Sequence, residues 1–244
     1  MNLVLDFGNT NVKLAIFNNG QLIELELFRK ISLEKVKNYI KSRHGIKNCI
    51  LSSVIDHPVA INQFLRDSYF FIDLNENSPI PIINLYHSKE TLGKDRLAAA
   101  VAGAALFPAR DILVINAGTC ITYEFVNSSG EYLGGAISPG LEMRLKALNT
   151  FTDKLPLVSF KVMDDFIGST TEKSILSGVF YGIVAEIESI TTRYKNLYPD
   201  LKVILSGGDL NYFDNRLKIS IFAFPFIVIY GLNQILEFNV TTTT

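Results

Sequence analysis

The sequence predicts an α/β protein in which one arrangement of strands and helices occurs twice. Three strand-like segments followed by a helical segment open the chain, and the same order begins again roughly 110 residues later. VLDFGNT at 4–10 and VINAGTC at 114–120 occupy the same place in the two copies. We therefore expect two lobes, residues 1–112 and 113–244, that face each other across a cleft, where small-molecule sites tend to form.

Hydrophobic periodicity predicts the elements of the first lobe. Strands are expected at 3–8, 11–17, 21–28, 47–54 and 69–74. Helices are expected at 32–44 with Ser32 as a candidate N-cap, in a short segment after Pro58, and in the Ala-rich segment 93–107. Residues 75–92, which contain Pro79 and Pro81, are expected to form a loop.

The second lobe repeats this pattern. Strands are expected at 111–116, 120–126, 131–138 and 202–208, and helices at 139–149, 170–195 and 224–238. The four C-terminal threonines are expected to be frayed, because chain ends are rarely held in place.

Composition excludes several classes of function. The net charge of −1 over 244 residues gives no electrostatic footprint for nucleic acid or an anionic membrane. Cys49 and Cys120 have no neighbouring Cys or His in a zinc-ligand spacing, and isolated thiols suit a reducing cytoplasm. The start of the chain carries no basic leader, and the longest apolar windows, 97–107 and 219–230, are too short to span a bilayer. We expect a cytoplasmic protein.

The DFGNT turn at 6–10 places a carboxylate at the end of a buried strand. Gly8 allows backbone N–H groups to approach a ligand, and Asn9 and Thr10 add short donors, so the turn could hold phosphate oxygens while Asp6 holds Mg²⁺. The same residue types are common in ordinary hairpin turns, and one copy alone favours that interpretation. The second copy reverses the balance.

The NAGTC turn at 116–120 keeps the small residues Gly118 and Thr119, with Thr122 just beyond it. Asn116, however, stands where the first copy has Asp6. An amide oxygen can still bind a hard cation, but it brings no negative charge.

Residues 93–96, GKDR, place an acid beside an arginine at the start of a helix. Asp95 could be a structural partner of the helix dipole, or a general base for a substrate hydroxyl. Arg96 opposes the dipole and could bind a substrate carboxylate through its planar fork. The residues alone leave both interpretations open.

Two glycine-rich stretches could also approach a ligand. GGAISPG at 134–140 leads into a helix N-terminus and could bind an anion, and Gly207–Gly208 could let a nucleoside lie against the backbone. Each could equally be a simple turn. No Walker or GxGxxG sequence is present, and His44, His57 and His87 are expected at the surface.

Together these motifs resemble type III pantothenate kinase, within the acetate-kinase/actin/hexokinase superfamily. The resemblance covers nearly the whole chain. Seven segments occur in family order: DFGNT at 6–10, Tyr86 followed by LGKDR at 92–96, NAGTCIT at 116–122, GGAISPG at 134–140, DKLP at 153–156, GSTTEKSILSG at 168–178 and LSGGD at 205–209. Any one of them is weak, whereas seven in order are specific.

The resemblance implies duplicated ribonuclease H-like lobes of the actin-like ATPase fold, with mixed sheets, flanking helices and an interlobe cleft. It implies transfer of the γ-phosphoryl group of ATP to the 4′-hydroxyl of pantothenate, the first step of coenzyme A synthesis. Asp95 would be the catalytic base. Mg²⁺ would accompany ATP, and a monovalent cation, K⁺ or NH₄⁺, is expected. The implied partners are pantothenate, ATP and a second copy in a homodimer, with no nucleic acid and no membrane.

The resemblance also assigns residues to ligands. Pantothenate would be bound by Tyr86, Gly93, Lys94, Arg96 and Thr171, the last reaching the site of the partner copy. ATP would be bound by Asp6, Gly8, Asn9, Thr10, Asn11, Val12, Lys13, Gly118, Thr119, Thr122, Gly207 and Gly208. Asp6 and Asn116 would be the metal ligands.

Asn116 departs from the family pattern, which has aspartate at this position. We expect weaker or altered cation binding rather than loss of activity. A non-catalytic regulator similar to the Bvg accessory factor is the alternative from another class, but retention of Asp6, Asp95 and Arg96 together favours the enzyme. A sugar or acid kinase of the same superfamily is a third possibility, which the GKDR element argues against.

Overall fold

The computed structural model describes residues 1–163 and 165–243. Its internal contacts divide the chain into two units. The first unit contains Met1–Pro108, Gly130–Leu133 and the segment from Phe226 onward. The second unit contains Ala109–Ser129 and Gly134–Pro225. The division predicted at residue 112 assigned the C-terminal helix to the second lobe, whereas the contacts place this helix in the first unit.

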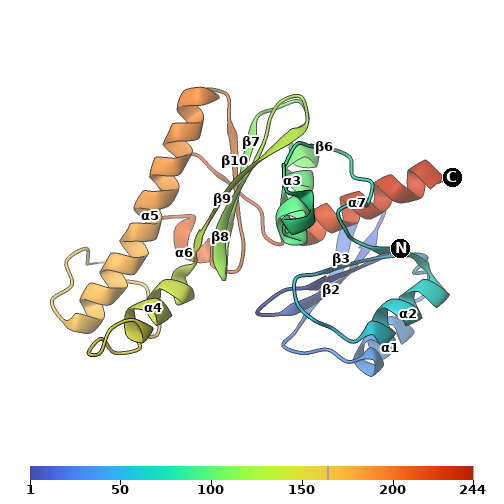
Figure 1. Ribbon diagram of the computed structural model, residues 1–244, viewed down its shortest axis with the longest axis horizontal. Helices are drawn as coiled ribbons and strands as arrows, with labels where there is room; N and C mark the ends of the chain where they lie inside the picture. Colours follow the sequence, from blue (N-terminus) through green and yellow to red (C-terminus); the bar gives the residue numbers. More distant parts are fainter. Residues whose placement is uncertain (164, 244) are drawn as a thin grey trace. The chain divides into compact units, whose positions relative to one another are not determined.

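The first unit is built on a five-stranded mixed sheet (Figure 1). Its elements are β1 (Asn2–Phe7), β2 (Val12–Asn18), β3 (Gln21–Phe28), α1 (Leu33–Lys41), β4 (Asn48–Ser53), α2 (Val59–Ser68), β5 (Phe70–Asp73), β6 (Ile83–Asn84), the 3₁₀ turn η1 (Lys89–Thr91), α3 (Lys94–Leu106) and α7 (Ile227–Thr243). The strand order is β3-β2-β1-β4-β5, in which β1 runs antiparallel to β2 and parallel to β4.

Helices cover both faces of this sheet. Leu3, Leu5 and Phe7 of β1 share a buried apolar cluster with residues of α1 and α2 on one face. The alternate β1 residues face α3 and α7, which lie side by side (Figure 1). The Asn2 side chain joins β1 to α7, since its Nδ2 donates to Asn233 Oδ1 at 2.9 Å.

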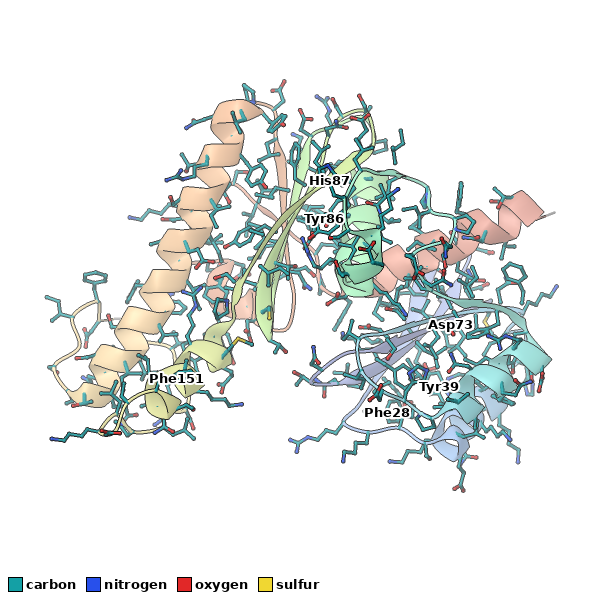
Figure 2. All side chains as sticks on the ribbon, viewed as in Figure 1. Phe28, Tyr39, Asp73, Tyr86, His87 and Phe151 are labelled. Atoms are coloured by element: carbon teal, nitrogen blue, oxygen red, sulfur yellow. The ribbon has the colours of Figure 1, made fainter. Side chains whose placement is uncertain are left out.

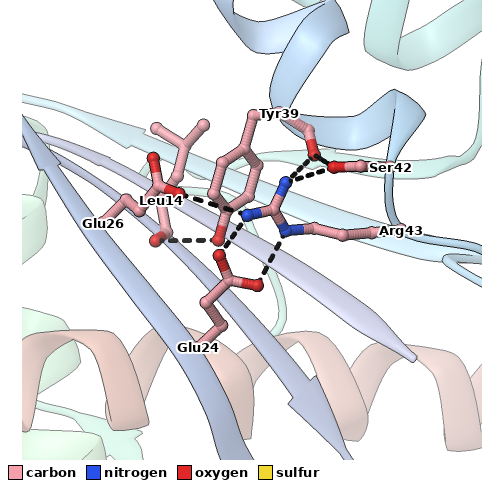
Figure 3. Close-up of polar contacts among 6 residues, drawn as sticks. All are labelled: Leu14, Glu24, Glu26, Tyr39, Ser42 and Arg43. Carbon is pink, nitrogen blue, oxygen red and sulfur yellow. Dashed lines mark hydrogen bonds and ion pairs between the residues drawn. The ribbon is translucent and has the colours of Figure 1, made fainter.

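A polar cluster ties β3 to the end of α1 (Figure 3). The Arg43 guanidinium lies over the Tyr39 ring, 3.6 Å from its centroid, and its Nε donates to Glu24 Oε2 at 2.8 Å. The hydrogen bond from Arg43 lowers the pKa of Glu24. This cluster holds the edge strand β3 against α1.

The second unit is built on strands that follow the same plan (Figure 1). Its elements are β7 (Ile112–Ala117), β8 (Cys120–Val126), β9 (Glu131–Pro139), α4 (Leu141–Thr150), α5 (Thr171–Leu197), β10 (Lys202–Ser206), α6 (Leu210–Phe213) and β11 (Phe222–Ala223). The sheet order is β11-β10-β7-β8-β9-β6. The first residues of β9, which pair with β6, are counted with the first unit.

The two sheets confirm the predicted duplication. In each, the third, second, first, fourth and fifth strands of the repeat lie in that order, and the first strand is antiparallel to the second and parallel to the fourth. In the second sheet, β6 is added beyond the third strand. The register is also shared, because Asp6 pairs with Lys13 and Ser52 while Asn116 pairs with Thr122 and Ser206.

Most predicted elements are confirmed within one to three residues, including Ser32 as the N-cap of α1. The 75–92 loop prediction is wrong at two places, where β6 and η1 occur, and the short elements α6 and β11 were not predicted. Helix α7 continues through Thr243, so three of the threonines expected to fray are helical, and Thr244 lies outside the described residues.

Helix α5 was predicted at 170–195, but no membrane-length segment was expected. Among the described residues, α5 is the one helix long and apolar enough to cross a bilayer, by length and composition alone. Ile175, Phe180 and Ile187 on α5 are buried in the apolar core of the second unit. The apolar character of this helix is therefore explained by core packing.

Candidate active site

Asp6 lies at the end of β1, at the start of the first turn. The residue is 3% exposed, and Lys13 Nζ of β2 is 2.7 Å from its Oδ2. The turn closes through a 3.2 Å bond from Gly8 N to Asn11 O, which leaves Asn9 and Thr10 exposed. The turn thus joins a buried carboxylate, a lysine and exposed short donors within a few residues.

Ser52, on the neighbouring strand β4, is a site residue that sequence reasoning missed. It is paired in register with Asp6 and is fully buried. Ser52 Oγ has no hydrogen-bond partner within the described part of the chain, which is costly for a buried hydroxyl. No signal in the sequence distinguishes Ser52 from its neighbour Ser53 at the same strand end.

These donors fit a divalent ion bound together with a nucleotide. Mg²⁺ usually takes one or two carboxylates, with phosphate and water oxygens completing its octahedron. Asp6 supplies the carboxylate, and Ser52 offers a hydroxyl that has no partner among the described residues. No group of three His, Cys, Asp or Glu side chains that could hold a metal occurs among residues 1–163 and 165–243. The ion would therefore need phosphate oxygens from the nucleotide.

Asp95 and Arg96 occupy the first turn of α3, with Gly93 as the N-cap. Asp95 Oδ1 accepts a 2.9 Å hydrogen bond from Arg96 N. Burial raises the pKa of Asp95 above its ordinary value, and the negative charge of Asp6 raises it further. This electrostatic coupling shows that the fold brings together the two carboxylates singled out in the sequence.

Tyr86 is held in place by its own loop and by β9. Asn84 Oδ1 accepts from Tyr86 N at 3.0 Å, and Leu85 N donates to Tyr132 O at 3.0 Å. The ring of Tyr132, which is fully buried, stacks on Tyr86 with centroids 6.1 Å apart and planes at 23°. The Arg96 guanidinium lies 5.6 Å from the Tyr86 centroid. Tyr86, Arg96 and Tyr132 therefore form one stacked group in the first unit.

A cavity of about 290 Å³ adjoins this stacked group. Leu85, Tyr86, His87, Ser88 and Leu133 line it, and Figure 2 labels Tyr86 and His87 in this region. Sequence reasoning identified Tyr86 but missed Tyr132 and Leu133, because the pairing of β6 with β9 that brings them there is only two residues long.

The second unit gathers three sequence motifs around the Asn116 turn. Gly118 N donates to Cys120 O at 3.0 Å, and Gly140 N donates to Thr119 O at 3.1 Å. Gly207 has φ of +103°, and a Cβ there would lie 2.0 Å from Ala117 O. NAGTC, SPG and SGG therefore meet through close backbone contacts that require glycine at 207.

The side chains of the turn itself, Asn116 to Cys120, carry no acid or base. Thr119 is exposed, and Thr122 is buried with an Oγ1 that has no partner among the described residues. Asp209, which follows Gly208 and was not predicted as a site residue, is held near the turn by a 3.1 Å bond from its N to Ala117 O. Burial and the nearby Glu142 raise the pKa of Asp209.

A polar cluster braces the 134–140 segment. Arg144 Nε donates to Pro139 O at 2.8 Å, and its guanidinium contacts Glu186 on α5. Ser138 Oγ and Tyr123 OH donate to the two oxygens of Glu186 at 3.1 and 3.0 Å. Burial raises the pKa of Tyr123. Spacing alone could not predict this cluster, because Glu186 is far from the motif in sequence.

The remaining predicted residues are placed as follows. Thr171 is the first residue of α5 and is exposed, with Thr170 as the N-cap. Gly208 is exposed, and a Cβ there would meet nothing within 4 Å. Val12 is buried in the core of the first unit, which leaves its backbone as the part able to meet a ligand. Lys94 lies half-buried at the start of α3.

Comparison with known proteins identifies the family. The profile of the family described as type III pantothenate kinase matches residues 2–193. The chain belongs to this family. A type III pantothenate kinase from Phocaeicola vulgatus is 46% identical over 240 residues, which cover 98% of this chain and 99% of the relative. The family suggested by the motifs is therefore confirmed by similarity over nearly the whole chain.

Solved structures support the fold. A conserved Baf family transcriptional activator from Campylobacter jejuni, so described provisionally, matches with a TM-score of 0.61 at 20% identity, covering 98% of this chain and 99% of that one. A ROK family glucokinase from Streptomyces griseus, in complex with glucose and AMPPNP, matches with a TM-score of 0.55 at 9% identity, covering 96% and 99%. At these identities the likeness shows the fold alone, the duplicated architecture of actin-like ATPases and sugar kinases.

Proposed function

We propose that the chain catalyses ATP-dependent phosphorylation of pantothenate to 4′-phosphopantothenate, in coenzyme A biosynthesis. The observation that carries this proposal is family membership over nearly the full length, together with Asp6, Asp95 and Arg96 in one unit of the fold. The regulator alternative is not favoured, because the likeness to the transcriptional activator is at 20% identity while the similar relatives are kinases.

Asp95 acts as the general base in this proposal. Its carboxylate accepts the proton of the pantothenate 4′-hydroxyl as that oxygen attacks the γ-phosphorus. Burial and the charge of Asp6 raise the pKa of Asp95. The raised pKa lies closer to neutral pH, which makes the carboxylate a better proton acceptor. The hydrogen bond from Arg96 N fixes the orientation of the carboxylate.

Arg96 binds the pantothenate carboxylate, and Tyr86 lines the pocket beside it. The stack of Tyr132 on Tyr86 limits the motion of the ring, and the ring in turn supports the guanidinium. Gly93 and Lys94, at the start of the same helix, also bind pantothenate. Thr171 reaches the pantothenate site of a second copy in a homodimer. The protein works in the cytoplasm.

The phosphate turn of each unit is assigned to ATP. Backbone N–H groups and side chains of residues 8–13 contact phosphate oxygens, and Lys13 is available to them if it leaves Asp6. Gly118, Thr119 and Thr122 contact phosphate from the second turn, while Gly207 and Gly208 lie against the nucleoside. Asp6 would hold Mg²⁺ together with ATP, and the ion would offset the charge of the phosphate oxygens. Ser52 stabilises the same arrangement through its hydroxyl.

Asn116 sets how the monovalent cation, K⁺ or NH₄⁺, is held. The amide oxygen offers a ligand without a charge, so cation binding is weaker or less selective than with a carboxylate. The comparison that tests this is the K⁺ requirement of the natural chain against its Asn116→Asp variant. An identical requirement in the two proteins would contradict the assignment.

Phosphorylation of pantothenate by the purified chain, with ATP and Mg²⁺, tests the function directly. Asp95→Asn is expected to lower kcat by about 10² to 10⁴, the usual contribution of a general base. Full activity in this variant would remove Asp95 as the base. Arg96→Ala is expected to raise the KM for pantothenate, and an effect confined to the KM for ATP would reassign Arg96.

A further inference from the structure

A basic groove lies next to the first phosphate turn, on the first unit. Strand β3 ends at Phe28, which pairs in register with Val12 at the start of β2. Arg29 and Lys30 therefore emerge beside the turn that carries Thr10. The groove has a volume of about 700 Å³ and is lined by Thr10, Leu27, Phe28, Arg29, Lys30 and Lys35.

The charges of this groove have a single sign. Arg29, Lys30 and Lys35 are all exposed, and none of their side chains makes an ion pair or side-chain hydrogen bond with another described residue. No acid of the described residues lines the groove, and Glu26 on β3 is engaged by Arg43. Three like charges around one hollow repel one another unless an anion offsets them.

The groove is open to solvent, and its three cations suit a phosphate. Arginine forms paired hydrogen bonds to phosphate oxygens, and lysine adds a point charge. Thr10, which belongs to the turn proposed to bind ATP, also lines the groove, so the two regions are continuous. A phosphate-bearing ligand bound at the turn could therefore reach the groove through contacts with the first unit alone.

We propose that this groove binds a phosphate-bearing anion at the edge of the first phosphate turn, through Arg29, Lys30 and Lys35. The proposal rests on the proposed function, which supplies two sources of the same chemistry. One is the terminal phosphate of the nucleotide, and the other is the phosphate monoester of the product. When either ligand leaves the turn, its phosphate group enters the groove. The positive charges of Arg29, Lys30 and Lys35 hold the phosphate there until the ligand dissociates.

Calorimetric titration of the intact protein with tripolyphosphate tests the site without turnover. Arg29→Gln with Lys30→Gln removes two charges from the groove while keeping polar side chains. Lys41→Gln with Lys47→Gln removes two exposed charges elsewhere on the same unit and is the matched control. We expect tripolyphosphate to bind at least tenfold more weakly to the groove variant, and within twofold of the natural chain to the control. All four positions are exposed, and thermal melting confirms that both variants are folded.

Equal affinity in the natural chain and the groove variant would overturn the proposal, as would equal weakening in groove variant and control, which would indicate a general charge effect. The binding result also stands apart from the kinase proposal. Tripolyphosphate binding that is lost in the groove variant, in a chain unable to phosphorylate pantothenate, would support the groove and contradict the kinase function.

Kinetics then separate the two sources. A raised KM for ATP in the groove variant, with the KM for pantothenate unchanged, assigns the groove to the nucleotide. Weaker inhibition by 4′-phosphopantothenate, with the KM for ATP unchanged, assigns it to the product. If neither changes in an active enzyme, the groove takes no part in the reaction and the proposal fails.

Discussion

Replacement of Tyr132 by leucine isolates the contribution of the stacked ring to pantothenate binding. Tyr132 lies behind Tyr86, with ring planes at 23°, and Arg96 lies 5.6 Å from the Tyr86 centroid. An aromatic pair contributes about 0.5 to 1.5 kcal/mol beyond burial, and a cation over a ring about 0.5 to 1 kcal/mol. Loss of the Tyr132–Tyr86 stack and weakening of the Arg96–Tyr86 contact together amount to about 1 to 2 kcal/mol.

That free energy corresponds to a rise of roughly 5- to 30-fold in the KM for pantothenate, since about 1.4 kcal/mol is tenfold. The KM for ATP and kcat should stay within twofold, because the stack of Tyr132 acts on pantothenate through Tyr86 and Arg96. A coupled assay of ADP release, with each substrate varied in turn, measures all three. Tyr132→Phe keeps the ring and should retain the KM for pantothenate. A folded Tyr132→Leu enzyme with an unchanged pantothenate KM, or with both KM values raised equally, would refute the reasoning.

Three further predictions follow from the same sites. Asp6→Asn should lower the pKa of Asp95, because the charge that raises it is gone; carbon-13 NMR titration of the Asp95 carboxyl measures this, and an unchanged midpoint contradicts the coupling. The pKa of Asp95 is higher in the folded chain than in the unfolded chain, so ionisation of Asp95 at higher pH destabilises the fold. In denaturant unfolding, Asp95→Asn should therefore be more stable than the natural chain at neutral pH and equally stable near pH 3. Ser52→Ala removes a buried hydroxyl without a partner among the described residues, so the melting temperature of the ligand-free protein should rise by a few degrees. Calorimetry of the same variant should show weaker binding of Mg²⁺ with an ATP analogue. A lower melting temperature would mean that the hydroxyl has a partner.

Gly207→Ala gives a prediction about the second turn. A side chain at φ of +103°, with its Cβ 2.0 Å from Ala117 O, should destabilise the protein by about 2 to 5 kcal/mol in denaturant unfolding. Gly208→Ala is the matched control, because a Cβ there meets nothing within 4 Å, and its effect should be under about 1 kcal/mol. Equal effects at the two positions would contradict the requirement for glycine at 207.

The sequence predicted what depends on local pattern. The long strands and helices, the duplicated order and the paired turns at Asp6 and Asn116 all follow from periodicity and turn chemistry, which act over short stretches of chain. Asp95 and Asp6 were singled out separately, and only the packing of α3 on the sheet shows that their charges interact.

What could not be predicted depends on contacts between distant segments. Tyr132 reaches Tyr86 only because β6 pairs with β9 over two residues, and Ser52 acquires its place only from its register with Asp6. Arg29 and Lys30 look like an ordinary basic turn until the pairing of Phe28 with Val12 places them beside Thr10. A buried hydroxyl without a partner among the described residues, as at Ser52, has no signature in a single sequence.

The position of α7 has a consequence for synthesis of the protein. This last helix packs beside α3 and against β1 and β4, and the side chain of Asn2 is bonded to Asn233. Domains usually fold as units while the ribosome is still working. Here the first unit remains without one of its helices until the whole second unit has been made. The second unit is continuous apart from four residues, so it can complete its fold first, and the unit that carries Asp6 and Asp95 is completed last.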